Sequence, residues 1–557
     1  MVTVVKTLPF DGQKPGTSGL RKRVVVFQQP HYTENFIQAI FTAMPAPGPH
    51  GATVVVGGDG RYYVKDVVQK IIRIGAANGI ARFIVGKDGI LSTPAASAVI
   101  RMRKADGGII LTASHNPGGP DNDFGIKYNT RNGGPAPEAV TDAMHQATLS
   151  ITEYKTIAAS AADGLADVDL SAVGEQAFDG FVVEIVDPVE DYVELMKGIF
   201  DFDLIKRFRS ENPQFSLLFD ALNGVTGPYG ERIFVEELGF PASCLDQCTP
   251  LEDFGGLHPD PNLTYAHRLV ERVAKERISL GAASDGDGDR NMVLSHDWFV
   301  TPSDSVALIA HYAADCIPYF KNNGGLSGLA RSMPTSCAID RVAARKGLEC
   351  FEVPTGWKFF GNLMDAGRLS ICGEESFGTG SDHIREKDGI WAIVAWLNII
   401  AHVSQTVPNT SVRSLMLDFF SIYGRNYFTR YDYEEVDAAG AGQMMDRLRG
   451  LGADIVGKSF GGTAVSKVDD FEYTDPIDGS VSKKQGVRVI FADSSRIIFR
   501  LSGTGSQGAT VRIYIEKYDS ERCDQDAQVA LKPLVDAALE ISKLEEFTGR
   551  KTPTVIT

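Results

Sequence analysis

Cysteine is scarce in this sequence, and long apolar runs are missing. Seven cysteines among 557 residues are scattered and odd in number, which argues against a disulfide framework and favours a reducing compartment. Cys244 and Cys248 lie closest to each other, but no matching Cys or His pair stands at zinc spacing. No uncharged stretch is long enough to cross a bilayer, and the first residues lack the pattern of a secretory leader. We therefore expect a cytoplasmic protein without a membrane segment.

Cations are also few compared with anions. The 55 Lys and Arg residues face 71 Asp and Glu residues, which gives a formal charge of −16. Proteins that bind a nucleic-acid backbone need the opposite excess, so nucleic acid is excluded as a general partner. If the ligand is a small phosphate ester, the cations that bind it must gather at one place on the molecule.

Low-complexity tracts and short repeats are absent, and the chain is too long for a single hydrophobic core. Proline and polar residues separate periodic segments near 187–188, at 301–304 and around 405–409. These positions predict four domains, which span residues 1–187, 188–302, 303–405 and 406–557.

Most of the chain alternates between short strand-like runs, polar or glycine-rich loops and helix-like stretches. This alternation indicates α/β units whose strand-end loops carry the functional site. The last domain differs, because two strand-like runs precede a long helical pattern, which indicates an α+β fold. The predicted strands are 53–56, 83–85, 107–111, 216–219, 280–283, 369–372, 486–491 and 496–501. The predicted helices cover 67–77 and 527–544, and another begins with Thr93 as N-cap and Pro94 as its first residue.

The strongest local motif is DGDGDR (285–290), which we call the metal loop. Three carboxylates at alternate positions after an apolar strand can converge on one hard divalent cation. An EF-hand is excluded, because Arg290 and His296 stand where its glycine and glutamate belong. Arg290 could orient the carboxylates or reach a phosphate. A solvated acidic turn is the alternative interpretation.

The segment TASHNPGG (112–119), the serine loop, places Ser114 and His115 directly after an apolar strand. A serine there caps a turn, attacks as a hydrolase nucleophile or carries a phosphoryl group, and the serine alone leaves all three open. The G-x-S-x-G elbow of lipases is absent, because Thr112 and Asn116 occupy its glycine positions.

The stretch RLSGTGSQGATVR (500–512), the phosphate loop, contains a formal G-x-G-x-x-G pattern. A dinucleotide site needs a helix after this pattern, but the following residues are strand-like. A Walker loop is excluded as well, because Ala509 replaces its lysine. A glycine-rich turn with hydroxyls and flanking arginines predicts a phosphate nest, and a plain hairpin with surface arginines is the alternative. The side chains concerned are those of Arg500, Ser502, Thr504 and Arg512.

Three further segments place polar residues in loops: GLRK (19–22), TGWK (355–358) and GEESFG (373–378), with Lys387 downstream of the last. The pairing of carboxylate and hydroxyl in 373–378 suits recognition of neighbouring sugar hydroxyls, so we call this segment the sugar loop. Taken singly, each of these segments also fits a solvated loop.

Together, TASHNPGG, DGDGDR, PTGWK, CGEESFG and RLSGTGSQGATVR, in this order, resemble the α-D-phosphohexomutase superfamily, most closely its eukaryotic phosphoglucomutase branch. The resemblance covers nearly the whole chain. It implies three related α/β domains with mixed sheets and a C-terminal α+β domain around a central cleft. It also implies interconversion of glucose 1-phosphate and glucose 6-phosphate through a phosphoserine and a glucose 1,6-bisphosphate intermediate.

The resemblance also implies roles for individual residues. Ser114 would be the phosphoserine and, with Asp285, Asp287 and Asp289, would hold Mg²⁺. Glu374 and Ser376 would bind the 3- and 4-hydroxyls of the sugar. The grip on the non-reacting phosphate would involve Arg500, Ser502, Thr504, Gly505 and Arg512. Other substrate contacts would come from Arg21, Asp289, Arg290, Thr355, Gly356 and Lys387. The candidates for catalysis beside Ser114 are His115, Lys127, Arg290 and Lys387.

Several related functions compete with this one. A mutase for mannose, N-acetylglucosamine or glucosamine phosphates is the first rival, but the sugar loop resembles the glucose-specific branch. A catalytically silent binding or cytoskeletal relative would have a damaged serine or metal loop, and both are intact here. A phosphatase would need water at the phosphoserine. We expect small hexose phosphates as partners, no nucleic acid and no membrane, and a monomer or weak dimer.

Overall fold

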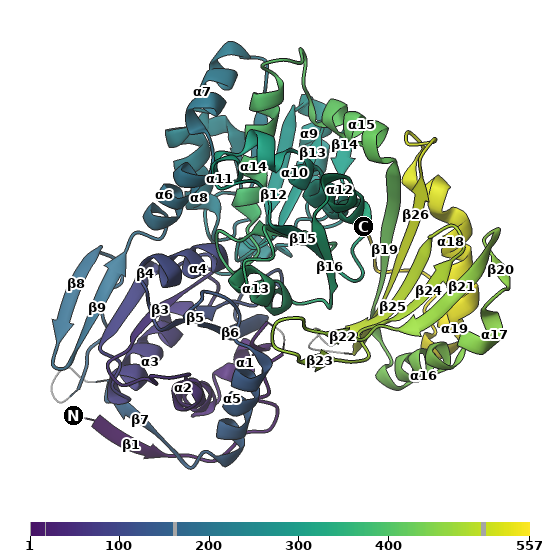
Figure 1. The fold of residues 1–557 in the computed structure, drawn as a ribbon. Coiled ribbons are helices and arrows are strands. Elements are labelled where there is room, and N and C mark those ends of the chain that lie inside the picture. Colours follow the sequence, from purple (N-terminus) through teal and green to yellow (C-terminus); the bar gives the residue numbers. More distant parts are fainter. Residues whose placement is uncertain (1, 17, 160–163, 503–507) are drawn as a thin grey trace.

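The computed structural model describes residues 2–16, 18–159, 164–502 and 508–557. Figure 1 shows four bodies along an arc, with the first domain in purple at one end and the C-terminal domain in yellow-green at the other. None of the helices in these ranges is long and apolar enough to cross a membrane.

The first domain is built on a mixed sheet in the order β2-β6-β5-β3-β4-β9-β8. Its central strands run parallel, and their continuous apolar runs are buried on both faces, as expected for a sheet covered by helices. The strands are β2 (Leu20–Arg23), β3 (Thr53–Gly58), β4 (Arg82–Ile90), β5 (Gly107–Leu111), β6 (Asp123–Thr130), β8 (Gly174–Phe178) and β9 (Phe181–Val186), and β1 (Val2–Lys6) pairs separately with β7 (Glu153–Ile157). The helices are α1 (Val24–Phe27), α2 (Tyr32–Ala43), α3 (Val64–Ala77), α4 (Thr93–Met102) and α5 (Glu138–Ser150).

The second domain has the sheet order β11-β10-β12-β13-β14. Its strands are β10 (Leu217–Asp220), β11 (Leu245–Asp246), β12 (Leu280–Ser284), β13 (Asn291–Ser295) and β14 (Trp298–Val300). Its helices are α6 (Glu190–Ile199), α7 (Phe202–Glu211), α8 (Gly227–Gly230) and α9 (His267–Glu276), with a π-helical turn at Glu231–Glu237 and short 3₁₀ turns at Ala242–Cys244 and Phe254–Gly256.

The third domain has the sheet order β16-β15-β17-β18. Its strands are β15 (Gly328–Ser332), β16 (Glu349–Val353), β17 (Ile371–Glu374) and β18 (Gly378–Ser381). Its helices are α10 (Pro302–Cys316), α11 (Pro318–Asn322), α12 (Ala338–Lys346), α13 (Trp357–Asp365) and α14 (Gly389–Val403), followed by α15 (Val412–Tyr423).

The three sheets share one topology. In each, three parallel strands are ordered second-first-third, and a fourth strand runs antiparallel beside the third: β4-β3-β5-β6, β11-β10-β12-β13 and β16-β15-β17-β18. The prediction of three related α/β domains with mixed sheets is therefore confirmed. One continuous apolar core joins these domains and includes α14, which is buried over 389–401, with Trp391 and Trp396, and much of α15; the first domain also has a separate core of its own.

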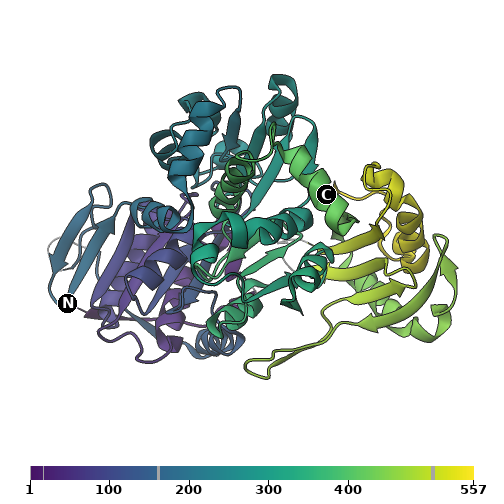
Figure 2. The same ribbon diagram turned by 45° about the horizontal axis from the view of Figure 1, so that its top comes forward.

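The C-terminal domain has a seven-stranded antiparallel sheet in the order β20-β21-β24-β25-β26-β19-β27, so the predicted α+β fold is confirmed. Its strands are β19 (Arg425–Val436), β20 (Ser459–Phe460), β21 (Thr463–Asp470), β24 (Val487–Phe491), β25 (Arg496–Ser502), β26 (Ala509–Asp519) and β27 (Val555–Ile556). The helices are α16 (Ala438–Gly450), α17 (Gly452–Ile455), α18 (Ala527–Ser542) and α19 (Leu544–Thr548). Figure 2 shows a hairpin of β22 (Tyr473–Thr474) and β23 (Val481–Ser482) projecting from this sheet.

Three predicted helix ends differ from the structure, and the first is the start of α3, which lies at Val64 rather than at residue 67. The N-cap of α4 is Ser92, whose side chain accepts the Ala95 N–H at 3.2 Å, and Thr93 is already helical. The reason is that the Thr93 hydroxyl points away from the helix and donates to Asp287 at 2.7 Å. The last predicted helix is two helices, because Lys543 adopts a left-handed conformation that ends α18 at Ser542.

Candidate active site

The three motif loops of the α/β domains occupy the same topological position. The serine loop connects β5 to β6, the metal loop connects β12 to β13, and the sugar loop connects β17 to β18. Each connection therefore follows the third parallel strand, at its carboxyl end. Loops at this edge of open α/β sheets commonly form binding sites.

Ser114 is buried and lies against the metal loop. Its Oγ donates to Asp285 Oδ2 at 3.0 Å and lies 3.3 Å from His115 Nδ1. Its backbone has a φ of 55°, a left-handed conformation that is costly for a residue other than glycine. The Ser114 N–H donates to Thr112 Oγ1 at 2.7 Å, which helps hold this turn. The hydroxyl is thus fixed in one orientation by residues of two domains.

A buried ion pair that the sequence did not reveal supports the serine loop. Asp59 and Arg61 are both buried, with Arg61 Nε 2.9 Å from Asp59 Oδ2. Arg61 also donates to the Ser114 carbonyl at 2.8 Å and to the Asp123 carbonyl at 2.8 Å, while Asp59 accepts from Thr112 Oγ1. The pair therefore ties both ends of the serine loop to the loop after β3.

Asp285, Asp287 and Asp289 form a buried cluster in which one carboxylate oxygen from each lies within 4.8 Å of the others. Gly288, with a φ of +85°, allows the tight turn, and a Cβ on Gly286 would meet the Ser114 carbonyl at 2.7 Å. Burial, and then repulsion by Asp287 and Asp289, raises the pKa of Asp285 well above its usual value. A cation among the three carboxylates would remove this repulsion.

The cluster also offers free ligand atoms. Asp287 Oδ1 and Asp289 Oδ1 are buried, and neither has a hydrogen-bond partner among the described residues. Buried carboxylate oxygens without partners are costly, and oxygen ligands of this kind suit Mg²⁺. Burial alone would raise the pKa of Asp287, but the Thr93 hydrogen bond and nearby cations outweigh it and lower that pKa. The donor set therefore fits a hard divalent cation.

Lys387 and Arg290 lie where the metal loop meets the sugar loop. Lys387 Nζ is 3.2 Å from Asp289 Oδ2, and its chain packs against Gly378, where a Cβ would meet Lys387 Cδ at 2.3 Å. Arg290 pairs with Asp260 at 3.0 Å, and the Arg290 backbone forms an isolated β-bridge with Gly378. Burial opposes the charge of Lys387, but the carboxylates around it outweigh this and raise its pKa. Both predicted residues thus lie at the site, and both are cationic.

The sugar loop presents one carboxylate and one hydroxyl toward the site. Glu374 is buried, its Oε1 accepts the Gly356 N–H at 3.0 Å, and burial raises its pKa more than Lys387 lowers it. Ser376 lines the central cavity. The Thr355 hydroxyl is buried without a hydrogen-bond partner among the described residues, so the predicted TGWK segment lies beside the sugar loop with a free polar group.

His115 has a neighbour that the sequence did not reveal. Its ring stacks on the ring of His258, with the centroids 6.2 Å apart and the planes at 7° to each other. The ring of Tyr265 packs in turn on His258, with their centroids 3.9 Å apart. Burial, and then the charge of Arg290, lowers the pKa of His115 well below its usual value. A neutral imidazole beside the Ser114 hydroxyl can take up or release a proton.

Lys127 and Arg21 lie on the strands that border the serine loop. Lys127 of β6 donates to the buried carboxylate of Glu386, which also accepts from Asn129 at 2.8 Å. Lys127 is therefore already engaged in an ion pair with the third domain. Arg21 of β2 pairs in register with Gly125, and its Nε is buried without a partner among the described residues.

The C-terminal domain contributes cations on one face of its sheet. Arg512 of β26 faces the cavity, 3.4 Å from Asp432 of β19. Arg500 lies directly opposite Arg512 on β25, where its guanidinium donates to the Gln485 carbonyl at 3.1 Å. Ser502 ends β25. The predicted contacts Thr504 and Gly505 lie outside the described residues.

All four domains line one central cavity of about 260 Å³. Its wall includes one or more residues from each domain, among them Asn116, Asp260, Ser376 and Asp432, and also Val555 of β27. The predicted central cleft is therefore confirmed. Four cations lie on the wall, in a protein with a strongly negative total charge: Arg23, Arg290, Arg430 and Arg512.

Family models match each domain in turn. Residues 12–155, 190–298 and 301–417 match alpha/beta/alpha domains I, II and III of phosphoglucomutase/phosphomannomutase, and residues 425–554 match the C-terminal domain of phosphoglucomutase-1. The domain boundaries near 187, 302 and 405 stay predictions.

Curated proteins and solved structures match the whole chain. The Schizosaccharomyces pombe phosphoglucomutase is 58% identical over 100% of both chains, and the Solanum tuberosum cytoplasmic phosphoglucomutase is 56% identical over 100% of this chain and 99% of its own. The crystal structure of pp63/parafusin, a phosphoglucomutase from Paramecium, is 49% identical, covers 100% of this chain and 99% of its own, and has a TM-score of 0.90. The chain therefore belongs to the phosphoglucomutase/phosphomannomutase family, and its activity is that of a phosphoglucomutase.

Proposed function

We propose that Ser114 carries the phosphoryl group that this enzyme moves, with Mg²⁺ held beside it by Asp285, Asp287 and Asp289. The observation that carries this proposal is the contact of Ser114 Oγ with Asp285 at 3.0 Å, beside a buried carboxylate cluster with free oxygens. When bound there, Mg²⁺ would neutralise charge on the phosphate oxygens during transfer.

The substrates that we propose are glucose 1-phosphate and glucose 6-phosphate. Relatives at 55–58% identity carry the name phosphoglucomutase. The cavity wall combines arginines for phosphate with Ser376, and the same loop holds the buried carboxylate of Glu374 at the end of β17 for sugar hydroxyls. The 3- and 4-hydroxyls of glucose lie roughly symmetrically between the two phosphate positions, so one pair of side chains can bind both orientations.

The reaction then has two half-steps with one enzyme-bound intermediate. A free sugar hydroxyl attacks the phosphorus of phosphoserine 114, the bond to Ser114 Oγ breaks, and glucose 1,6-bisphosphate forms. The intermediate then reorients, so that its other phosphate faces Ser114. The phosphoryl group of that phosphate is transferred to Ser114 Oγ. Each half-step moves one proton between the sugar oxygen and Oγ. His115, neutral and 3.3 Å from Oγ, is our candidate for that proton, because Lys127 and Lys387 are held by carboxylates.

Arginines around the cavity would stabilise the transferring group. Arg290 belongs to the metal loop and Arg512 to the C-terminal domain, and both line the cavity. Positive charge that is already in place before the reaction favours the spread of negative charge over the equatorial oxygens.

A coupled assay tests the proposal. The protein is incubated with glucose 1-phosphate, Mg²⁺ and a trace of glucose 1,6-bisphosphate, and glucose 6-phosphate is followed. We expect product with the wild type and none with Ser114→Ala. Ser210→Ala, an exposed serine that donates only to its own helix, is the matched control and should keep full activity. Undiminished turnover by Ser114→Ala, or no product from the wild type, contradicts the proposal. Mannose 1-phosphate as the substrate, with mannose 6-phosphate followed as the product, tests the sugar preference.

We propose a cytoplasmic enzyme that is a monomer or a weak dimer. Relatives whose names state a compartment are called cytoplasmic or chloroplastic. All seven cysteines are free thiols, which is typical of a reducing compartment. A fluorescent fusion and sedimentation velocity measure these two properties.

A further inference from the structure

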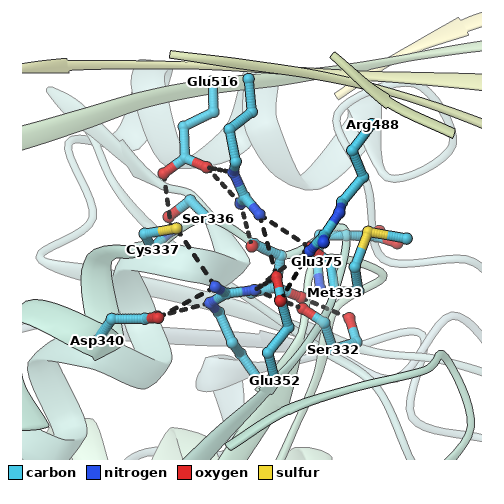
Figure 3. A network of polar contacts seen from close by, with 12 residues as sticks. Ser332, Met333, Ser336, Cys337, Asp340, Glu352, Glu375, Arg488 and Glu516 are labelled. Carbon is cyan, nitrogen blue, oxygen red and sulfur yellow. Dashed lines mark hydrogen bonds and ion pairs between the residues drawn. The ribbon is translucent and has the colours of Figure 1, made fainter. Parts of the chain in front are cut away.

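The C-terminal domain contacts the third domain through a buried network of charges, shown in Figure 3. Arg496 at the start of β25, which is 6% exposed, belongs to this network. The guanidinium reaches out of its own sheet and donates to the carbonyls of Thr335 at 2.9 Å and Met333 at 3.2 Å. Both carbonyls belong to residues 333–337, which follow β15 and which we call the junction loop.

Glu516 of β26 holds the junction loop from the other side. Its Oε2 accepts from Arg496 Nε at 2.7 Å, and its Oε1 accepts the Cys337 N–H at 2.7 Å. Asn426 of β19 donates to the same Oε1 at 2.7 Å. Two charged residues of the C-terminal domain therefore satisfy three backbone groups of one loop in the third domain. Buried charges are stable only when they are paired in this way, so the geometry of the contact is strongly determined.

The junction loop also contacts the sugar loop. Thr335 Oγ1 accepts the backbone N–H of Glu375 at 2.8 Å, and the Glu375 carboxylate accepts from Arg430 of β19 at 2.9 Å. Glu375 stands between Glu374 and Ser376, the two predicted sugar ligands. The sugar loop is thus connected to the C-terminal domain twice, once directly and once through the junction loop.

The same two strands carry the predicted phosphate ligands. Arg496 pairs with Glu516, and Arg500 pairs with Arg512 four positions further along the β25–β26 ladder. Residues four apart on a strand lie on the same face, roughly 13 Å from each other. A rotation at the Arg496–Glu516 pair would therefore move both arginines relative to the sugar loop.

We propose that Arg496 and Glu516 form a positioning pair that sets the separation between the phosphate-binding arginines and the sugar loop. Neither residue touches the cavity, so neither is a catalytic residue. The inference rests on the proposed substrate-binding roles of Glu374, Ser376 and Arg512. The apolar cores support it, because one core cluster spans the first three domains, beside a separate cluster within the first, while the C-terminal sheet and its helices form their own. Among the described residues, a smaller apolar cluster joins the C-terminal domain to the third domain, and Cys523 packs against the core of the first three domains.

Arg496→Met tests the proposal, since it keeps the alkyl stem and removes the charge. We expect the KM for glucose 1-phosphate to rise about tenfold, while kcat changes by less than about threefold, because the lost contacts serve binding rather than transfer. The matched control is Arg488→Met. Arg488 belongs to the same network, bound to Glu352 and Asp469, but does not contact the junction loop. The KM of Arg488→Met for glucose 1-phosphate should stay within about twofold of the wild-type value.

Hydrogen exchange provides a readout that does not depend on activity. The Cys337 amide donates to Glu516, and the Glu375 amide donates to Thr335. Both amides should exchange faster in Arg496→Met than in the wild type, and their exchange rates should not change in Arg488→Met. If Arg496→Met does not fold, Glu516→Gln keeps the shape of the pair and should raise KM by a smaller factor. An unchanged KM in a folded variant, or an equal rise in Arg488→Met, overturns the proposal. Wild-type turnover in the same assay separates this outcome from a failure of the proposed function.

Discussion

The hydroxyl of Ser114 donates to Asp285 across 171 positions of sequence, at 3.0 Å. A phosphoryl group on Ser114 has no proton to donate there, and it would repel the carboxylate unless a cation lay between them. We therefore expect phosphorylated protein to bind Mg²⁺ at least about tenfold more tightly than dephosphorylated protein. Titration calorimetry on the two forms measures the difference, with Ser114→Ala expected to behave like the dephosphorylated form. Equal affinities would show that Ser114 does not take part in metal binding.

The carboxylate cluster predicts that replacing one of its carboxylates by a neutral amide lowers both Mg²⁺ affinity and activity. Asp287→Asn keeps the size of the side chain but removes one charged oxygen ligand, so Mg²⁺ affinity should fall roughly 10- to 100-fold and activity should fall with it. Excess Mg²⁺ should restore part of the activity. Asp203→Asn, at a carboxylate that is 93% exposed, is the control and should change neither quantity. Full activity of Asp287→Asn in the presence of a chelator would refute the metal assignment.

The Asp59–Arg61 pair predicts a loss of both stability and activity. Arg61→Met would leave the Asp59 carboxylate buried without its cation, which costs about 3–5 kcal/mol in comparable pairs. It would also free the Ser114 and Asp123 carbonyls that Arg61 now binds. Thermal melting and the mutase assay measure the two effects. Lys65→Met on α3, whose side chain is 63% exposed, should change neither. A stable variant with wild-type activity would mean that the serine loop keeps its shape without Arg61.

Asp304 predicts a pH-dependent change in stability away from the cavity. Burial raises its pKa to about 6, although Arg425 acts to lower it. The folded state therefore keeps this proton to a higher pH than the unfolded state does. The contribution of this group to stability is greatest below pH 4 and is lost as pH rises through 6, by about 3 kcal/mol in total.

Asp304→Asn should remove that loss. The melting temperature of the variant should exceed that of the wild type by more at pH 8 than at pH 5. Asp315→Asn, exposed on the same helix α10, should show the same difference from wild type at both values. A difference for Asp304→Asn that does not grow with pH would contradict the raised pKa.

Much of the site could be predicted from local sequence because its motifs follow buried strands. The runs before Ser114, Asp285 and Glu374 are short, apolar and strand-like, and in each case the motif begins where the strand ends. Residue type then restricts the chemistry, since carboxylates at alternate positions suit a cation. Related sheets were implied only by the family resemblance, and the local pattern could not show that all three loops occupy the same position in them, because the strand order is set by packing between distant segments.

The residues that the sequence did not reveal act through partners far away along the chain. Asp59 and Arg61 stand in a glycine-rich turn, and nothing local shows that Arg61 reaches carbonyls 53 and 62 positions away. Arg430 and Asp432 lie on a strand whose alternating pattern fits an ordinary sheet, yet both line the cavity. Lys127 illustrates the converse, because its pairing with Glu386 depends on contact between two domains.

The cavity wall contains residues from both ends of the sequence, Arg23 and Val555. During synthesis, a ribosome would release the serine and metal loops long before the strand that contains Val555 emerges. The nascent chain would therefore hold a fixed Ser114 hydroxyl well before it has a complete place for sugar phosphate. Activity would begin late and all at once, and no single proteolytic cut between the domains would leave a fragment with the whole site.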